Sequence, residues 1–70
     1  MKRVGVRSSM INSIGYDEPR AVLEVEFEDG EVYDYFDVPL SVYEALRRAD
    51  SVGGYFNEAI RDQYEFKKVG

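Results

Sequence analysis

Residues 21–38 read AVLEVEFEDGEVYDYFDV, and this stretch decides the fold. From Ala21 to Phe27, apolar residues alternate with glutamates, which is the period-two pattern of a strand with one buried face. Asp29-Gly30 is a turn signal, and apolar residues then resume. The stretch therefore predicts a β-hairpin whose second strand is Val32–Val38.

The length of the hairpin loop decides which way the central tyrosines point. A two-residue loop would bury Asp34 without a partner and turn Tyr33 and Tyr35 outward. A three-residue loop with Gly30 in a left-handed bulge turns both tyrosines inward and places Asp34 across from Glu24 in solvent. A solvated like-charge pair costs about 1 kcal/mol or less, whereas a buried unpaired carboxylate costs several. We therefore predict the three-residue loop.

The segment before the hairpin predicts another strand. Met10–Tyr16 mixes apolar and small polar residues, and its alternation breaks near Gly15, where we expect a β-bulge. Residues 17–19, Asp-Glu-Pro, then predict a turn, because Pro19 fixes φ and cannot donate to a strand ladder.

Two helices are predicted after the hairpin. Ser41 and Glu44 have the spacing of a capping box, and the helix that they begin should run to about Ala49. Ser51 can cap a second helix. The apolar positions expected on the inner sides of the two helices are Val42, Leu46 and Ala49, and then Val52, Phe56, Ala59 and Ile60.

These elements together predict the fold class. Tyr64–Val69 alternates again and predicts a short closing strand. We expect an α+β fold, an antiparallel sheet of three strands, or four with the closing strand, with two helices packed on one face in the order β-β-β-α-α. No repeat or linker divides the chain, so we predict one domain, residues 1–70.

The composition excludes several kinds of chemistry. The chain has no cysteine and no histidine, which removes thiol catalysis, thiolate metal sites and the usual general base near neutral pH. Ser8-Ser9 therefore lacks the usual activating partner of a nucleophile. The acidic residues of the hairpin strands do not have the spacing of a calcium-binding loop. We predict no enzyme activity, no cofactor and no metal site.

The charge is unevenly distributed along the chain. The net charge is −5, yet Lys2, Arg3 and Arg7 open the sequence without an acid, and most of the acidic residues follow within residues 17–37. The start of the chain has no apolar stretch typical of a signal peptide, and no segment is long enough to cross a membrane, so we expect a cytoplasmic protein. An acidic total argues against general phosphate binding, because such affinity comes from Lys and Arg.

A series of short motifs runs along residues 6–69. They are Ser8-Ser9-Met10-Ile11, Ile14-Gly15-Tyr16-Asp17, Val32-Tyr33-Asp34-Tyr35-Phe36-Asp37-Val38-Pro39, Val42-Tyr43-Glu44, Ser51, Gly53, Tyr55-Phe56-Asn57, Ile60-Arg61 and Tyr64. In this order and spacing, they resemble the KTSC domain family.

The resemblance carries expectations of its own. The family is named for a segment at the C-terminus of some lysyl-tRNA synthetases and also occurs as small stand-alone bacterial proteins. It implies an RNA-related context and no catalytic residues. Other members have Tyr-Pro-Tyr and basic residues near the C-terminus, whereas residues 64–68 here are Tyr-Glu-Phe-Lys-Lys, which weakens any basic tail.

The candidate contact residues are aromatic or basic. Tyr33 and Tyr35, at period two on one strand, could stack successive bases, although the predicted register favours a role in the core. The basic residues near the two termini would form one patch if the terminal segments lie side by side. The candidates for contact with RNA or a partner are Arg7, Tyr33, Tyr35, Tyr55, Arg61, Lys67 and Lys68.

Two functions follow from these features. The first is a non-catalytic accessory domain that binds RNA, either tRNA or single-stranded, as the family context and the basic termini suggest. The second is a protein-interaction module that uses an acidic hairpin face and an exposed strand edge, which the net acidity favours. We expect no membrane contact.

Overall fold

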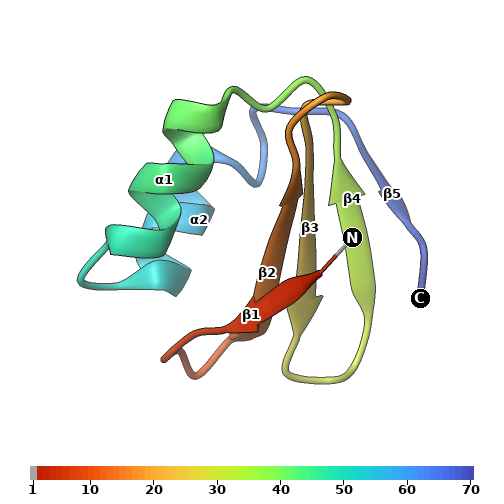
Figure 1. Ribbon diagram of the computed structural model, residues 1–70. Helices are drawn as coiled ribbons and strands as arrows, with labels where there is room; N and C mark the ends of the chain where they lie inside the picture. Colours follow the sequence, from red (N-terminus) through yellow and green to blue (C-terminus); the bar gives the residue numbers. More distant parts are fainter. Residues whose placement is uncertain (1) are drawn as a thin grey trace.

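The computed structural model describes residues 2–70; Met1, the first residue of the predicted domain, lies outside the described residues. A five-stranded antiparallel sheet has the order β1-β2-β3-β4-β5, and both helices lie on one side of it (Figure 1). The elements are β1 (Arg3–Gly5), β2 (Ile11–Asp17), β3 (Val22–Phe27), β4 (Val32–Tyr35), α1 (Leu40–Arg48), α2 (Val52–Ala59) and β5 (Phe66–Lys68).

The predicted α+β class and the helices on one face are confirmed, but the sheet has one strand more than expected. The closing strand is present as β5. The missed strand is β1, which spans three exposed residues within a basic segment. So short a strand has no alternation that sequence analysis could detect, and its pairing with β2 forms it.

The hairpin between β3 and β4 has the predicted register. Val25 pairs with Tyr33, and Leu23 pairs with Tyr35. Gly30 has φ +90°, a left-handed conformation that glycine adopts without strain. The three-residue loop is confirmed, and it turns both tyrosines toward the helices.

The bulge in β2 is not where the sequence suggested. The register shifts between Ile11 and Ser13, so the prediction of a bulge near Gly15 is wrong. Gly15 has a different role: a Cβ there would lie 2.8 Å from the carbonyl oxygen of Lys2 and 3.1 Å from Cγ of Arg3. The chain at the start of β1 passes directly over Gly15, and only a residue without a side chain leaves room for it.

The two helices begin differently. Ser51 caps α2 as predicted, and its hydroxyl accepts a hydrogen bond from the backbone N–H of Gly54 at 3.1 Å. The capping box predicted for α1 is wrong, because Pro39 is the N-cap and has no side-chain donor or acceptor to offer. With α1 beginning at Leu40, Ser41 already lies inside the first turn. The predicted end of this helix near Ala49 is confirmed, since Ala49 is its C-cap.

Substitution of the two serines should therefore have unequal effects. We expect Ser51→Ala to lower the free energy of unfolding by about 1 kcal/mol, because it removes the side-chain hydrogen bond that caps the start of α2. Ser41→Ala is the matched control and should change stability by less than about 0.5 kcal/mol. Urea unfolding of both variants measures the difference, and equal losses would contradict the assignment of the caps.

The core lies between the sheet and the helices. Buried residues from the strands meet Leu46 of α1 and Val52 and Phe56 of α2. Val32 and Phe36, which the predicted register leaves on the acidic face, are half-buried by the C-terminal segment. The amide of Val32 donates to the carbonyl of Gly70, and the amide of Phe36 donates to that of Glu65.

Candidate functional site

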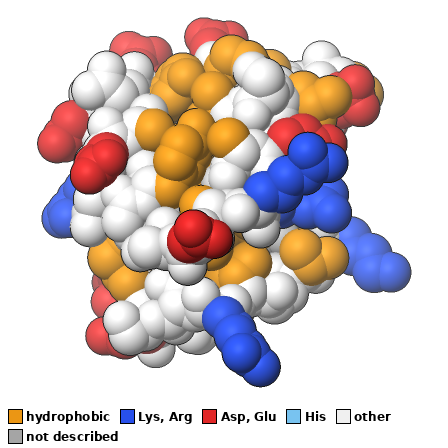
Figure 2. Space-filling view, turned by 90° about the vertical axis from the view of Figure 1, so that its left-hand side faces the viewer, with side chains coloured by type: hydrophobic (Ala, Val, Ile, Leu, Met, Phe, Trp, Pro, Cys, Tyr) orange, Lys and Arg blue, Asp and Glu red, His pale blue; other side chains and the backbone are white. Residues whose placement is uncertain are grey.

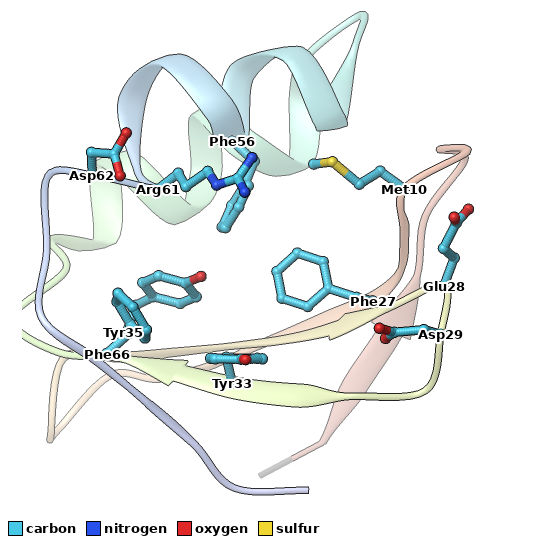
Figure 3. Close-up of a pocket in the computed structure, with 10 residues that line it drawn as sticks. All are labelled: Met10, Phe27, Glu28, Asp29, Tyr33, Tyr35, Phe56, Arg61, Asp62 and Phe66. Atoms are coloured by element: carbon cyan, nitrogen blue, oxygen red, sulfur yellow. The ribbon is translucent and has the colours of Figure 1, made fainter.

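A pocket of about 410 Å³ lies between the end of α2 and the strands β3, β4 and β5 (Figure 3). It is lined by the residue before β2, the hairpin and its loop, α2 with the turn that follows it, and the closing strand. The residues that line it are Met10, Phe27, Glu28, Asp29, Tyr33, Tyr35, Phe56, Arg61, Asp62 and Phe66.

Five aromatic rings in this pocket contact one another in a closed circuit. We call this set the aromatic ring circuit. Its successive centroid distances are 5.7 Å for Phe27–Tyr33, 5.7 Å for Tyr33–Phe66, 5.5 Å for Phe66–Tyr35, 5.3 Å for Tyr35–Phe56 and 5.4 Å for Phe56–Phe27. Edge-to-face and tilted pairs at such distances are favourable, so each ring helps to hold the next in place.

Strand alternation and pairing place these rings. Tyr33 and Tyr35 lie two residues apart on β4 and therefore face the same side of the sheet. Phe66 pairs with Tyr35 across β4 and β5, and Phe56 comes from α2. Tyr35 and Phe56 are 4% and 1% exposed, whereas Phe66 is 55% exposed, so the first two form the floor of the pocket and the last forms its rim.

The hydroxyl of Tyr35 points into the pocket (Figure 3). Within residues 2–70, no side chain or backbone group forms a hydrogen bond with it. Burial raises the pKa of Tyr35 to about 12, with a smaller contribution from the neighbouring Tyr33. The hydroxyl therefore stays protonated at neutral pH, and its oxygen is available to a ligand.

The charged groups of the pocket are mostly acidic. Glu28 and Asp29 come from the hairpin loop, and Asp62 comes from the turn after α2. Arg61 is the single basic residue of the lining, and its guanidinium donates to Oδ1 of Asn57 at 3.3 Å. All four charged residues are exposed, and three of them are acidic.

Of the seven candidate contact residues, the pocket brings together Tyr33, Tyr35 and Arg61. The other four lie elsewhere. Lys67 is paired opposite Asp34 on the outer face of the sheet, and Lys68 forms an ion pair with Glu31 at 3.4 Å. Arg7 borders a separate hollow of about 330 Å³ at the start of α2, and Tyr55 is half-buried against the core.

A single basic patch does not form. The idea required the terminal segments to lie side by side, but β1 and β5 are the two opposite edges of the sheet. Arg3 is engaged by Glu24, with 2.8 Å between the guanidinium and the carboxylate. On the face that carries α1, Figure 2 shows basic side chains on both sides of an apolar strip, with acidic side chains among them.

Three of the five rings in the aromatic ring circuit were not candidates from sequence. Phe27 and Phe56 were assigned to apolar core positions, and Phe66 was part of the predicted closing strand. The sequence contains the rings but no signal that they meet, because that depends on the pairing of β5 with β4. About thirty residues separate these two strands, and no tight turn connects them.

The outer face of the sheet carries a second unusual group. Asp34 lies across from Glu24 as predicted, but it is half-buried rather than solvated, and its Oδ1 is buried without a hydrogen-bond partner in the described chain. The correction arises because β5 covers one side of Asp34, which the sequence could not reveal. Burial first, and then the carboxyl group of Glu24, raise the pKa of Asp34 to about 6, against the lowering influence of Arg20 and Arg3.

This carboxyl group should make stability depend on pH. Its pKa rises from 3.8 to about 6 on folding, so protonation favours the folded state. The stabilisation is complete below 3.8 and is lost as the pH rises to about 6. We expect Asp34→Asn to raise the free energy of unfolding at pH 7 by about 1 kcal/mol, after allowance for solvent screening.

Urea unfolding of both proteins at neutral pH and near pH 4 measures this effect. The advantage of Asp34→Asn should shrink toward the lower pH, where Asp34 itself is protonated. A difference between the two proteins that stays constant with pH would contradict the raised pKa.

In residues 2–70, no group of three acidic, histidine or cysteine side chains is arranged to hold a metal ion. No helix in the same part of the chain combines the length and the apolar character that a bilayer crossing requires.

The fold and the pocket define a small α+β domain with a sheet of five antiparallel strands, two helices on one face and an aromatic pocket at one end. The KTSC domain family matches residues 7–64. The crystal structure of a KTSC domain protein from Yersinia pestis superposes with a TM-score of 0.96 at 35% identity and covers 99% of this chain and 97% of that one. The chain belongs to the KTSC domain family.

Relatives include both small proteins and a large enzyme. An uncharacterised protein from Stutzerimonas stutzeri is 47% identical over 64 residues, which are 91% of this chain and 90% of that protein. A lysine–tRNA ligase from Nostoc punctiforme is 39% identical over 61 residues, which are 87% of this chain but 11% of the ligase. The same domain thus occurs nearly alone and as a small part of a much longer chain.

Proposed function

We propose that this domain is a non-catalytic binding module whose aromatic pocket receives a side chain of a partner protein. The observation that carries this proposal is the position of the pocket, which opens between the acidic hairpin loop and the edge strand β5. A ligand there would meet aromatic rings, carboxylates and a strand edge at the same time.

The edge strand suggests how a partner would be held. β5 pairs with β4 on one side, and within residues 2–70 nothing pairs with its other side. An extended segment of another chain can add to such an edge through backbone hydrogen bonds, and alternate side chains then reach pockets on one face. Phe66 is exposed on this strand and forms the rim of the pocket, so an added segment would place a side chain close to the aromatic ring circuit.

The distribution of relatives supports a binding role. A domain that makes up 11% of a lysine–tRNA ligase and about 90% of a small separate protein works in two settings. This chain itself has no histidine and no cysteine, so it lacks the usual general base near neutral pH and a thiol nucleophile. Recognition of a partner is an activity that such a domain can provide both as a small separate protein and as part of a longer enzyme.

RNA is the second candidate ligand. A relative named lysine–tRNA ligase and a set of rings near Arg61 favour it, because single-stranded RNA is bound by base stacking together with basic side chains. The charges weigh against it. Three carboxylates and one guanidinium line the pocket, and the basic residues of the two termini lie at opposite edges of the sheet.

Two titrations of the isotopically labelled domain test these candidates. In the first, peptides selected from a random display library on the immobilised domain are added, and backbone amide shifts are followed. In the second, total tRNA and a uridine oligonucleotide are added at low and moderate salt. We expect the peptides to shift amides of β5 and the hairpin loop, and Phe66→Ala to weaken their binding by about tenfold.

Val4→Ala is the matched control, because Val4 is similarly exposed but lies on the opposite edge strand. It should leave peptide affinity unchanged. If no peptide is selected and RNA induces amide shifts that fade as salt rises, the ligand is RNA and not a protein. If neither class of ligand moves any amide, the binding role is refuted.

A further inference from the structure

We propose that the pocket is selective for a cationic side chain, a lysine or an arginine, of the partner protein. This inference rests on the proposed function and adds the chemistry of the group that is recognised. It depends on four features of the pocket, namely the aromatic ring circuit, the hydroxyl of Tyr35, the acidic rim and the position of Arg61.

The aromatic ring circuit is the first feature. The face of an aromatic ring carries negative potential, and a cation placed within about 6 Å of a ring centroid is attracted to it. Successive centroids here are 5.3–5.7 Å apart, and the rings come from three strands and a helix. Several rings around one space is the arrangement by which proteins recognise ammonium groups.

The hydroxyl of Tyr35 is the second feature. The side chain is 4% exposed, its hydroxyl points into the pocket (Figure 3), and the described chain provides no hydrogen-bond partner for it. The hydroxyl is reached from the pocket, so a ligand that enters can form a hydrogen bond with it. Ammonium and guanidinium groups carry only donors, and the phenol oxygen can accept from either.

The acidic rim is the third feature. Glu28 and Asp29 lie at one end of the pocket and Asp62 at the other (Figure 3), and Lys68 is already paired with Glu31. Each rim carboxylate is exposed and contributes little alone, but three charges of one sign raise the local concentration of cations. A phosphate or carboxylate ligand would be repelled at the same place.

Arg61 is the fourth feature. Its removal should change the affinity for a cationic ligand and for an anionic ligand in opposite directions, which makes the proposal testable. In Figure 3 its side chain extends across the top of the pocket, above the rings. Its charge matches that of the proposed ligand, and its hydrogen bond to Asn57, at 3.3 Å, is long for a bond from a charged donor. A cationic ligand must displace this guanidinium, so its removal should strengthen binding. For a phosphate-bearing ligand, the same change should weaken binding.

The test uses three small probes on the labelled domain: lysine and norleucine, each blocked at both ends as N-acetyl N-methylamides, and uridine monophosphate. Lysine and norleucine have similar aliphatic chains, and lysine adds the ammonium group. We expect blocked lysine to shift amides at Tyr35, Phe56 and Arg61, and norleucine to bind about tenfold more weakly. Arg61→Gln should strengthen lysine binding several-fold.

Arg48→Gln is the matched control, since Arg48 is an exposed arginine on α1 that does not line the pocket. It should leave lysine binding unchanged. Equal affinity for lysine and norleucine would show a merely apolar pocket and overturn the inference while the proposed function stands. Binding of uridine monophosphate that Arg61→Gln abolishes would also overturn it.

The two proposals fail separately. Selected peptides that lack lysine and arginine would refute the cationic occupant and keep the protein partner. If blocked lysine shifts amides of the domain but no peptide is selected, the cation site is supported and the protein partner is refuted.

Discussion

Replacement of Tyr35 by alanine is expected to lower the free energy of unfolding by about 3–5 kcal/mol. The ring is buried in the core and packs against Phe56 and Phe66, so alanine would leave a cavity and break the aromatic ring circuit in two places. A chain of this length has a total stability of about 4–10 kcal/mol, and the variant should be largely unfolded at moderate urea concentrations.

Tyr35→Phe is the control for this variant, because it keeps the ring and removes only the hydroxyl. That hydroxyl has no partner in the described chain, so its loss should change stability by less than about 1 kcal/mol. Urea unfolding followed by circular dichroism measures both variants. A loss below about 1 kcal/mol for Tyr35→Ala would contradict the core role of the ring.

Replacement of Gly15 by alanine is the second large effect expected. The added methyl group would lie 2.8 Å from the carbonyl oxygen of Lys2, and neither strand can yield without losing its pairing. We expect a loss of about 1–3 kcal/mol, and a greater loss for valine. Hydrogen exchange should show that the protection of β1 is lost first.

Gly5→Ala is the matched control, because it is another strand glycine of the same pair of strands. A Cβ at Gly5 would have Asn12 O as its nearest neighbour at 3.8 Å, an ordinary van der Waals contact. Stability should change by less than about 0.5 kcal/mol. Equal losses for the two glycines would show that the passage of β1 over Gly15 is not what constrains that position.

The pocket and the core share residues, which limits how binding can be studied. Tyr35 and Phe56 are both core residues and the floor of the pocket, so variants at these positions would confuse lost folding with lost binding. Phe66 and Arg61 are exposed and can be changed without opening the core. For this reason the binding experiments use these two positions.

The local features were predictable from sequence. Alternation in β3, the Asp29-Gly30 turn and the cost of a buried carboxylate were sufficient to predict the register that turns Tyr33 and Tyr35 toward the helices. Ser51 was recognised as a helix cap for a similar reason. Each of these features depends on interactions between residues close along the chain.

The capping box at Ser41 shows the limit of local patterns. Ser41 and Glu44 have the spacing of a capping box, but the N-cap is Pro39, two positions before Ser41, so Ser41 lies inside the helix that begins at Leu40. A shift of one or two residues at a helix end is within the uncertainty of any sequence pattern.

What the sequence determined by itself was the hairpin, its register and the apolar positions of the helices. The tertiary structure alone decided that β1 and β5 form opposite edges of the sheet. It also decided that five rings from distant segments line one pocket, and that Asp34 is partly buried. The physical reason is that strands distant in sequence pair through backbone groups, which every residue carries, so composition contains little information about which edges meet.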